Sequence, residues 1–424
     1  MKKTVKSLVL CSSLVAALTA CSEKENKEKV TLSVNQQMAA SELTEAGEQL
    51  ISPATFHLAD RAFAIALEKN PNDKKAQLYH TLLKRIMLFR GIIPRIDGMV
   101  KANSTPEKYA EFQASFATKN STTDFLTKPV DGAKAIKTVE DVQNVLIEYR
   151  EALQDFRNFV KQNPDLQLSL NLNPYVFQET IQNRMMDNCQ IVAGSTDEDA
   201  KVECDYKNAS TVRVNIADLM ALKQEAAGEI LYLTLYTSYG FNGFIEASKA
   251  AEAQPEMSGK ASYDLMTEKM DLRLLNKQGM TAIRDIMTDF GVAAKWAMKY
   301  QESLCPKDKN GRAIGRKAFM FASGLCIEDS TALEKNLGVL GQALQGTMKV
   351  DLGSDVNAQP TSKNINFMAL FDRPVKNLRA LLPSEWNNDG SKATAFKDKT
   401  LGGLLPDGDA DDLLKMTPKA KAAR

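Results

Sequence analysis

An apolar stripe with a helical period runs through the segment between Asp264 and Ser303. An apolar or small residue recurs there every three or four positions, at Leu272, Leu275, Gly279, Ile283, Ile286, Phe290, Ala293 and Ala297. This spacing places side chains on one face of an α-helix, whereas a strand alternates every two residues. The segment therefore predicts one or two long helices that bury one face.

Helical patterns continue through most of the 424 residues, 44% of which are hydrophobic, so the chain is long enough to bury a sizeable core. We predict an all-α protein, either a helical array or an irregular bundle. From Gly346 onward Gly, Pro, Asn and Asp become frequent, which indicates an extended, loop-rich C-terminal arm. Its expected anchors are Phe367, Leu370, Phe371, Leu381, Leu382, Leu404 and Leu405.

Residues 40–73 carry small and large residues in an order that brings two helices close together. The first half has Leu43, Ala46, Gly47 and Leu50, and the second half has Ala59, Phe63, Ala66 and Pro71. This pattern resembles one tetratricopeptide repeat, which implies an antiparallel helical hairpin of a kind that presents surfaces to other proteins. The alternative is a helical hairpin that matches the repeat by chance.

A second match is only partial. It consists of Ala152, Phe156, Phe159 and Pro164, with a bulky Phe159 where the repeat family has alanine. The resemblance therefore covers at most the N-terminal quarter or third of the chain, and a stack of such repeats needs about three units. We expect degenerate repeats or an irregular bundle.

The first twenty residues have the order of an export signal. Lys2, Lys3 and Lys6 precede a short apolar run that ends in Leu18-Thr19-Ala20-Cys21. The run is shorter than the ~20 residues that a membrane span needs. Leu-x-Ala-Cys resembles the lipobox of bacterial lipoproteins, which implies cleavage before Cys21 and lipid attachment to Cys21. The alternative is an ordinary signal peptide with a chance cysteine.

A charged run, Ser22 to Lys29, follows the lipobox and has no apolar residue to bury, so we expect a disordered tether over residues 21–33. Several acyl chains are sufficient for stable membrane anchoring. The residue after the lipidated cysteine is Ser22 and not Asp. In this respect the chain is similar to lipoproteins that are directed to the outer membrane of Gram-negative bacteria. The expectation is an outer-membrane, periplasm-facing protein anchored by its N-terminal lipid.

The charge of the chain is balanced, with 54 Lys and Arg against 53 Asp and Glu. Removal of the leader takes away three of the lysines. Nucleic-acid binding uses a basic excess that neutralises phosphates, and the chain has none. We therefore do not expect a nucleic-acid partner.

Four cysteines remain after Cys11 leaves with the leader and Cys21 is lipidated: Cys189, Cys204, Cys305 and Cys326. An even number in an exported protein predicts two disulfides. Three connectivities are possible. We favour the local pairs Cys189 with Cys204 and Cys305 with Cys326, because each brackets one polar excursion. A four-thiolate metal site is the alternative, but the CxxC spacing is missing.

Residues 216–253 form a long apolar segment that predicts a buried core helix. Tyr232, Tyr236 and Tyr239 follow the spacing of one helix face within it. These tyrosines are either lining a groove for a ligand or peptide or packed in the core with satisfied hydroxyls.

The sequence Asp407-Gly408-Asp409-Ala410-Asp411 alternates carboxylates in the way that Ca²⁺ loops do. Asp412 stands where an EF-hand loop has Gly, and Pro418 replaces its closing Glu. We expect a solvated acidic turn and no cofactor, with weakly bound Ca²⁺ at Asp407, Asp409 and Asp411 as the alternative.

Only two histidines occur, His57 and His80, and the motifs of common hydrolases are absent from the sequence. We therefore expect no enzyme and no catalytic residue.

The sequence predicts five regions: a lipoprotein signal peptide (residues 1–20), a tether (21–33), an N-terminal helical region (34–165), a helical core with two cysteine loops (166–345) and the C-terminal arm (346–424). The expected function is that of a lipid-anchored scaffold or assembly factor that binds other envelope proteins through helical repeat surfaces. The alternative is a solute-binding lipoprotein that uses the tyrosine-lined groove.

Overall fold

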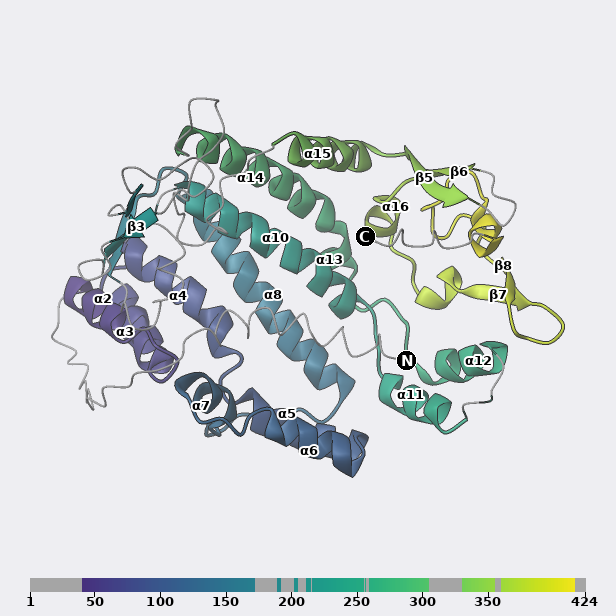
Figure 1. The fold of residues 1–424 in the computed structure, drawn as a ribbon, viewed down its shortest axis with the longest axis horizontal. Helices are drawn as coiled ribbons and strands as arrows, with labels where there is room; N and C mark the ends of the chain where they lie inside the picture. The colour runs from purple at the N-terminus through teal and green to yellow at the C-terminus, as the bar shows by residue number, and fades with distance from the viewer. Residues whose placement is uncertain are drawn as a thin grey trace. The chain divides into compact units, whose positions relative to one another are not determined.

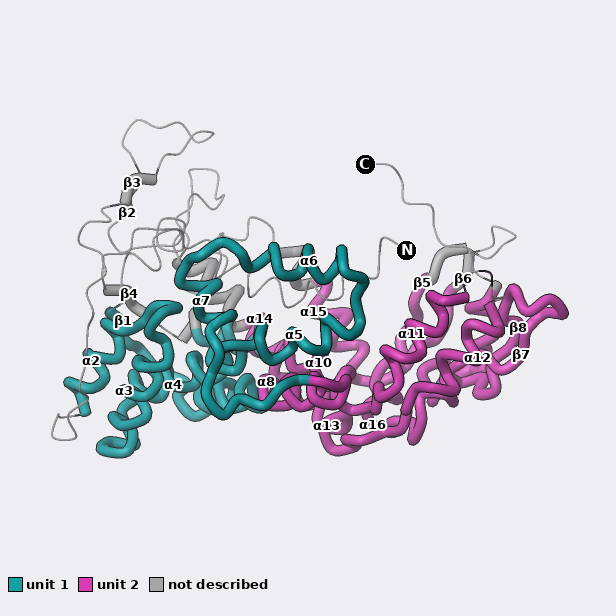
Figure 2. The backbone as a smooth tube through the Cα atoms, turned by 90° about the horizontal axis from the view of Figure 1, so that it is seen from below, with its two compact units in different colours: residues 1–136, 151–226, 296–330 teal, residues 137–150, 227–295, 331–424 magenta. Residues whose placement is uncertain are grey.

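The structure is a computed structural model that describes residues 40–171, 189–191, 202–204, 211–214, 216–254, 256, 259–304, 330–354 and 360–415. It is mostly helical and adds small two-stranded sheets to the predicted helices (Figure 1). The chain divides into two compact units (Figure 2). Unit 1 comprises residues 1–136, 151–226 and 296–330, and unit 2 comprises residues 137–150, 227–295 and 331–424.

Unit 1 begins with a series of helices: α2 (Ala40–Gln49), α3 (Phe56–Lys69), α4 (Lys74–Met87), α5 (Ile92–Asn103), α6 (Pro106–Ala114) and α7 (Ser121–Thr127). Three long helices contribute to both units: α8 (Val139–Gln162), α10 (Ile216–Ser238) and α14 (Ile283–Leu304). The core of unit 1 contains the fully buried side chains of Leu43, Phe63, Leu78, Leu153 and Phe156.

The repeat-like segment does form two helices that are packed on each other, α2 and α3. Helix α3 ends at Lys69, shortly before Pro71, because the residue ahead of a proline disfavours the helical conformation. Gly47 lies against Phe63: a Cβ at position 47 would be only 2.6 Å from Cε1 of that ring. The close approach expected at Gly47 is therefore present, although membership in the repeat family stays a prediction.

Two antiparallel strand pairs belong to unit 1, and one is nested inside the other in the sequence. Strand β1 (Leu168–Asn171) pairs with β4 (Thr211–Val214), and between them β2 (Cys189–Ile191) pairs with β3 (Val202–Cys204). The all-α prediction did not include these strands. Three or four residues are too few to show the alternation of apolar and polar residues that marks a strand in a sequence.

Unit 2 contains the helices α11 (Phe244–Glu252), α12 (Gly259–Lys269), α13 (Lys277–Thr281) and α15 (Ser330–Gln345), together with its parts of the three shared helices. From Gly279 onward the apolar stripe divides between α13 and α14, with Ile283, Ile286 and Ala293 buried. Leu272 and Leu275 precede both helices, so the prediction that the stripe is helical from Leu272 onward is wrong at its start.

The C-terminal stretch is more structured than an extended arm. It contains the antiparallel pairs β5 (Met348–Ser354) with β6 (Pro360–Ile365) and β7 (Pro383–Trp386) with β8 (Ala393–Phe396). Two short helical turns lie between β6 and β7, α16 (Ala369–Asp372) and η3 (Leu378–Leu381), and η4 (Ala410–Lys415) follows β8. This stretch contains a small core of Ile365, Phe396, Leu401, Leu405 and Ala410, against which Val350, Leu381, Leu404, Leu413 and Leu414 pack. Leu405 is thus an anchor as expected, whereas Phe367 is exposed.

None of the described helices has the combination of length and hydrophobicity that crossing a membrane requires.

Candidate functional site: an exposed aromatic face on α10

The second half of α10 exposes three large side chains on one side. Tyr232 is 54% exposed, Tyr236 is 52% exposed and Leu235 is 39% exposed. Residues three and four positions apart are neighbours on a helix surface, so these three form one patch, which we call the α10 face. Ile230, Thr234 and Thr237 of the same helix are buried. Helix α10 is therefore buried along one side and presents aromatic rings on the other.

Tyr239 does not share this surface. It is only 4% exposed, and its hydroxyl donates a hydrogen bond to the carbonyl of Val375 at 3.2 Å. Burial raises the pKa of Tyr239 above its usual value. Its backbone pairs with Leu274, just after the helix ends. The three tyrosines of the sequence pattern thus divide into two exposed rings and one structural side chain.

Helix α8 fixes the end of α10 through polar contacts within unit 2. Gln143 is buried, and its Nε2 donates to the carbonyls of Tyr236 and Tyr239, each at 2.7 Å. Carbonyls in the last turn of a helix have no intrahelical partner, so Gln143 satisfies that of Tyr236 and also binds the carbonyl of Tyr239 just after the helix. Arg150 Nη1 also donates to Thr237 Oγ1 at 2.8 Å. These contacts fasten the backbone beneath the α10 face to α8.

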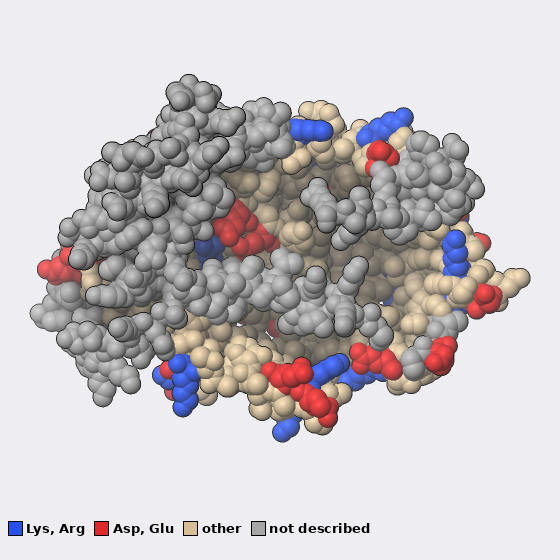
Figure 3. All heavy atoms as spheres, viewed as in Figure 1, with Lys and Arg blue, Asp and Glu red and all other residues tan. Residues whose placement is uncertain are grey.

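A carboxylate lies one turn before the exposed rings. Glu229 Oε2 accepts a hydrogen bond from the Tyr149 hydroxyl at 2.6 Å. On the face of the molecule drawn in Figure 3, acidic and basic side chains of the described residues lie beside one another. A polar pair such as Glu229 with Tyr149 beside an aromatic patch is usual at a protein-binding surface.

Other large apolar side chains are also exposed in unit 2. They are Phe244 on α11, Leu275 before α13, Val292 on α14, Val339 on α15 and Phe367 before α16. Together with the α10 face they account for all the exposed large apolar residues among the described parts of the chain. A contiguous patch indicates an interaction surface better than single exposed residues do, and the three residues of the α10 face are neighbours on one helix.

The acidic C-terminal motif is engaged with lysines and amides. Lys363 Nζ lies 2.5 Å from Asp409 Oδ2 and 2.5 Å from Asp412 Oδ2. Asp411 accepts from the backbone N–H of Phe396 and from Lys399 Nζ, and Asp407 accepts from Asn364 Nδ2 at 2.8 Å. Burial opposes the charge of Lys363, but its two carboxylate partners raise its pKa above the usual value.

These contacts join the motif to β6 and to the segment after β8. Among the described residues no group of three or more His, Cys, Asp or Glu is placed to hold a metal ion. Ca²⁺ binding at Asp407, Asp409 and Asp411 stays a prediction, and an arriving ion would have to compete with Lys363 and Lys399 for the same oxygens.

The cysteine predictions fall on different parts of the structure. Cys189 and Cys204 are directly opposite each other in the β2–β3 pair. Cys21, Cys305 and Cys326 lie outside the described residues.

Both histidines lie in unit 1 and have polar surroundings. His80 Nδ1 is 2.8 Å from Asp60 Oδ1, which joins α4 to α3. Partial burial lowers the pKa of His57, and the nearby charges of Arg90 and Lys128 lower it further. The Asp60 contact gives His80 a structural role between two helices.

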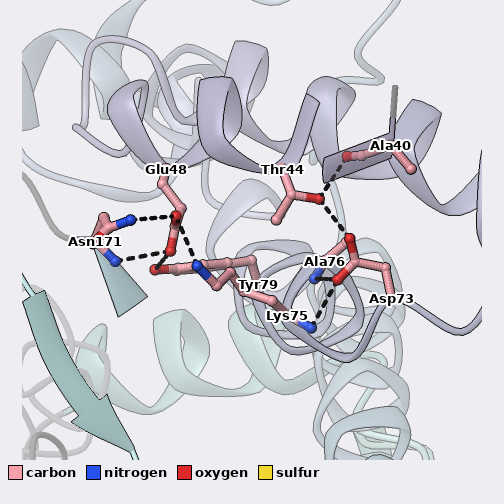
Figure 4. A network of polar contacts seen from close by, with 8 residues as sticks. All are labelled: Ala40, Thr44, Glu48, Asp73, Lys75, Ala76, Tyr79 and Asn171. Atoms are coloured by element: carbon pink, nitrogen blue, oxygen red, sulfur yellow. Dashed lines mark hydrogen bonds and ion pairs between the residues drawn. The ribbon is translucent and has the colours of Figure 1, made fainter. Parts of the chain in front are cut away.

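Sequence reasoning missed a buried carboxylate in unit 1. Glu48 on α2 has no exposed surface, and Figure 4 shows its two oxygens surrounded by donors. Oε1 accepts from the Tyr79 hydroxyl at 2.9 Å and from the backbone N–H of Asn171 at 2.8 Å. Oε2 accepts from Lys75 Nζ at 3.1 Å and from Asn171 Nδ2 at 3.3 Å. Burial and the adjacent Glu48 raise the pKa of Tyr79 strongly.

The same helices have a second polar link one turn earlier on α2. Asp73 caps α4, accepting from the backbone N–H groups of Lys75 and Ala76 at 3.0 Å each. Its other oxygen accepts from Thr44 Oγ1 at 2.8 Å. Glu48 and Asp73 together therefore fasten α2 to α4 and to β1. Glu48 carried no signal in the sequence, since its partners are 27 to 123 residues away along the chain.

Comparison with protein-family models, with curated proteins and with solved structures found no match.

Proposed function

We propose that this protein is a lipid-anchored, non-enzymatic scaffold of the bacterial envelope that binds another protein through the α10 face. The observation that supports binding most directly is the exposure of Tyr232, Leu235 and Tyr236 on a helix whose end is held by Gln143. Tyrosine is enriched at binding hot spots because it buries a large area with few rotatable bonds.

The export and anchoring part of the proposal rests on the sequence of residues 1–21. A basic start, a short apolar run and Leu18-Thr19-Ala20-Cys21 together support lipidation at Cys21 and an outer-membrane location facing the periplasm. An anchored protein meets its partner in two dimensions, which raises the effective concentration of a modest binding surface.

The α10 face supports a protein partner better than a small solute. A solute groove needs convergent walls, and the tyrosine that would complete such a wall, Tyr239, is buried against Val375. Two exposed rings with an adjacent leucine instead form a convex patch on one helix. A partner that covers this patch with its own aliphatic or aromatic side chains would remove the rings from water.

The test compares cross-linked complexes of the wild type and of Tyr232→Ala/Tyr236→Ala. Both proteins are expressed at wild-type level in the native envelope, cross-linked mildly and purified. We expect a defined envelope protein to be recovered with the wild type and to be lost from the double variant. Truncation of a tyrosine hot spot typically costs about 2 kcal/mol or more, which corresponds to roughly thirtyfold in affinity.

Val339→Ala is the matched control, because Val339 is an exposed apolar residue of unit 2 on another helix. We expect it to retain the partner. Both variants change surface residues, so their circular dichroism spectra should equal that of the wild type. Recovery of the same partner with the double variant at wild-type yield would refute binding through the α10 face.

A further inference from the structure

Two strand pairs are nested between residues 168 and 214. The outer pair, β1 with β4, places Asn171 opposite Thr211, and the inner pair, β2 with β3, places Cys189 opposite Cys204. The outer pair therefore closes the base of one long excursion from the helical body, and the inner pair joins two positions within it.

The base of this excursion is fastened to α2. Asn171 is the last residue of β1, and both its backbone N–H and its side-chain amide donate to the buried Glu48 carboxylate. A charged acceptor makes such hydrogen bonds stronger than neutral ones. The strand that leads into the excursion is thus fixed at its end by the helical body.

The inner pair has a register that suits a covalent link. Residues directly opposite in an antiparallel pair have Cα atoms about 4.5 to 5.5 Å apart. A disulfide spans Cα separations of roughly 4.4 to 6.8 Å. Within this three-residue ladder the register also places Ile191 opposite Val202, two positions along from the cysteines.

We propose that Cys189 and Cys204 form an intramolecular disulfide that staples β2 to β3. The structure gives the register of the two backbones, and the covalent bond between the two sulfurs is our proposal. The pairing leaves Cys305 and Cys326 as partners for each other. Of the three connectivities that four cysteines allow, the other two would require Cys189 and Cys204 to part from the residue that each one faces in the ladder.

The bond forms by thiol–disulfide exchange with an external disulfide donor. The Cys189 thiolate attacks the donor disulfide, which forms a mixed disulfide and releases one donor thiolate. The Cys204 thiolate then attacks the Cys189 sulfur, which forms the new bond and releases the second donor thiolate. Two electrons pass to the donor, and the two cysteine protons are taken up by the released thiolates. The compartment proposed above would supply a protein disulfide as donor, and oxidised glutathione serves in vitro.

Tryptic peptide mapping can determine which cysteines are linked. Trypsin cuts after Arg184, Lys201 and Lys207, so Cys189 falls in peptide 185–201 and Cys204 in peptide 202–207. Cys305 and Cys326 fall in peptides 300–307 and 318–335. Each connectivity therefore yields a different pair of linked masses. The full chain is purified from the envelope, alkylated without reduction, digested and analysed by mass spectrometry.

We expect the linked pair 185–201 with 202–207, lost on reduction. The variant Cys326→Ser should retain this pair, and Cys204→Ser should lose it and leave Cys189 open to alkylation. A parallel sample is reduced, refolded and oxidised with glutathione. It tests whether the two cysteines can pair, independently of whether the protein is exported to an oxidising compartment. Free thiols in the envelope sample together with a linked pair after glutathione treatment would contradict the proposed export and would leave the proposed pairing standing. Crossed peptides, or free Cys189 and Cys204 in both samples, would overturn the staple.

Discussion

Replacing Gly47 with alanine is the sharpest test of the packing in unit 1. A Cβ at this position would be 2.6 to 3.0 Å from three carbons of the Phe63 ring, which is closer than such atoms approach in folded proteins. Phe63 has little freedom to move away. It is fully buried, and its ring stacks on Tyr79 with centroids 4.7 Å apart and 9° between the planes. Tyr79 is in turn held by its hydrogen bond to Glu48.

The expected magnitude has two opposing contributions. Alanine stabilises a helix by roughly 0.5 to 1 kcal/mol relative to glycine. Overpacking a well-filled core costs about 1 to 3 kcal/mol. We therefore expect Gly47→Ala to lower the free energy of unfolding by roughly 1 kcal/mol, within a range from near zero to about 2.5 kcal/mol. Gly47→Leu adds further carbons to the same place and should lower it more.

Gly98→Ala supplies the matched control. Gly98 also lies within a helix, α5, and a Cβ there would have no atom within 4 Å. This variant should gain the helix contribution without the clash and become more stable by roughly 0.5 to 1 kcal/mol. The difference between the two variants thus isolates the clash, at about 1 to 3 kcal/mol. Urea unfolding followed by circular dichroism measures it. Equal stabilisation by both substitutions would refute the close approach of α2 to Phe63.

Three further predictions concern the carboxylates and the anchor. Glu48→Ala leaves Tyr79 and Lys75 without their buried acceptor, so we expect a loss of about 3 to 5 kcal/mol in urea unfolding, whereas the exposed neighbour Glu45→Ala should stay within about 0.5 kcal/mol of the wild type. If the two variants unfold at the same midpoint, Glu48 does not hold α2 in place. Cys21→Ser should leave the protein unprocessed or soluble in cell fractionation, and wild-type retention of this variant on membranes after a high-salt wash would contradict lipidation. Ca²⁺ should raise the melting temperature only near or above ~10⁻⁴ M. Asp409→Asn should abolish that rise. No rise in melting temperature at several millimolar Ca²⁺ would leave only the lysine-paired acidic turn. A micromolar midpoint that is lost in the variant would show a much stronger Ca²⁺ site than expected.

Local features of the fold could be predicted from the sequence. A proline ends a helix within a few residues, and α3 does end at Lys69, two residues before Pro71. Local rules suffice there because helix capping and proline geometry act within a few residues. The close approach at Gly47 was also predictable, since a glycine among large residues implies a neighbour that fills its place.

Features that depend on distant residues could not be predicted in this way. Glu48 has the appearance of a surface residue in the sequence, and only Lys75, Tyr79 and Asn171 together make its burial favourable. The β1–β4 pair joins segments separated by a long excursion, so neither strand shows its partner locally.

The α10 face was predictable only in part. Tyr232, Tyr236 and Tyr239 share one helical spacing, but α10 ends at Ser238, so Tyr239 follows the helix and turns inward toward Val375. Leu235 was not singled out, because nothing in its local spacing distinguishes an exposed leucine from a core leucine.

Site-specific photo-cross-linking in living cells tests most directly whether the α10 face binds another protein. A photoreactive amino acid is placed at Tyr236 in one strain, at the exposed Glu246 of α11 in a second and at the buried Tyr239 in a third. Because only Tyr236 belongs to the α10 face, we expect one discrete, light-dependent adduct with an envelope protein from that position and none from the other two. Absence of an adduct at Tyr236, or the same adducts at all three positions, would contradict a binding role for the α10 face.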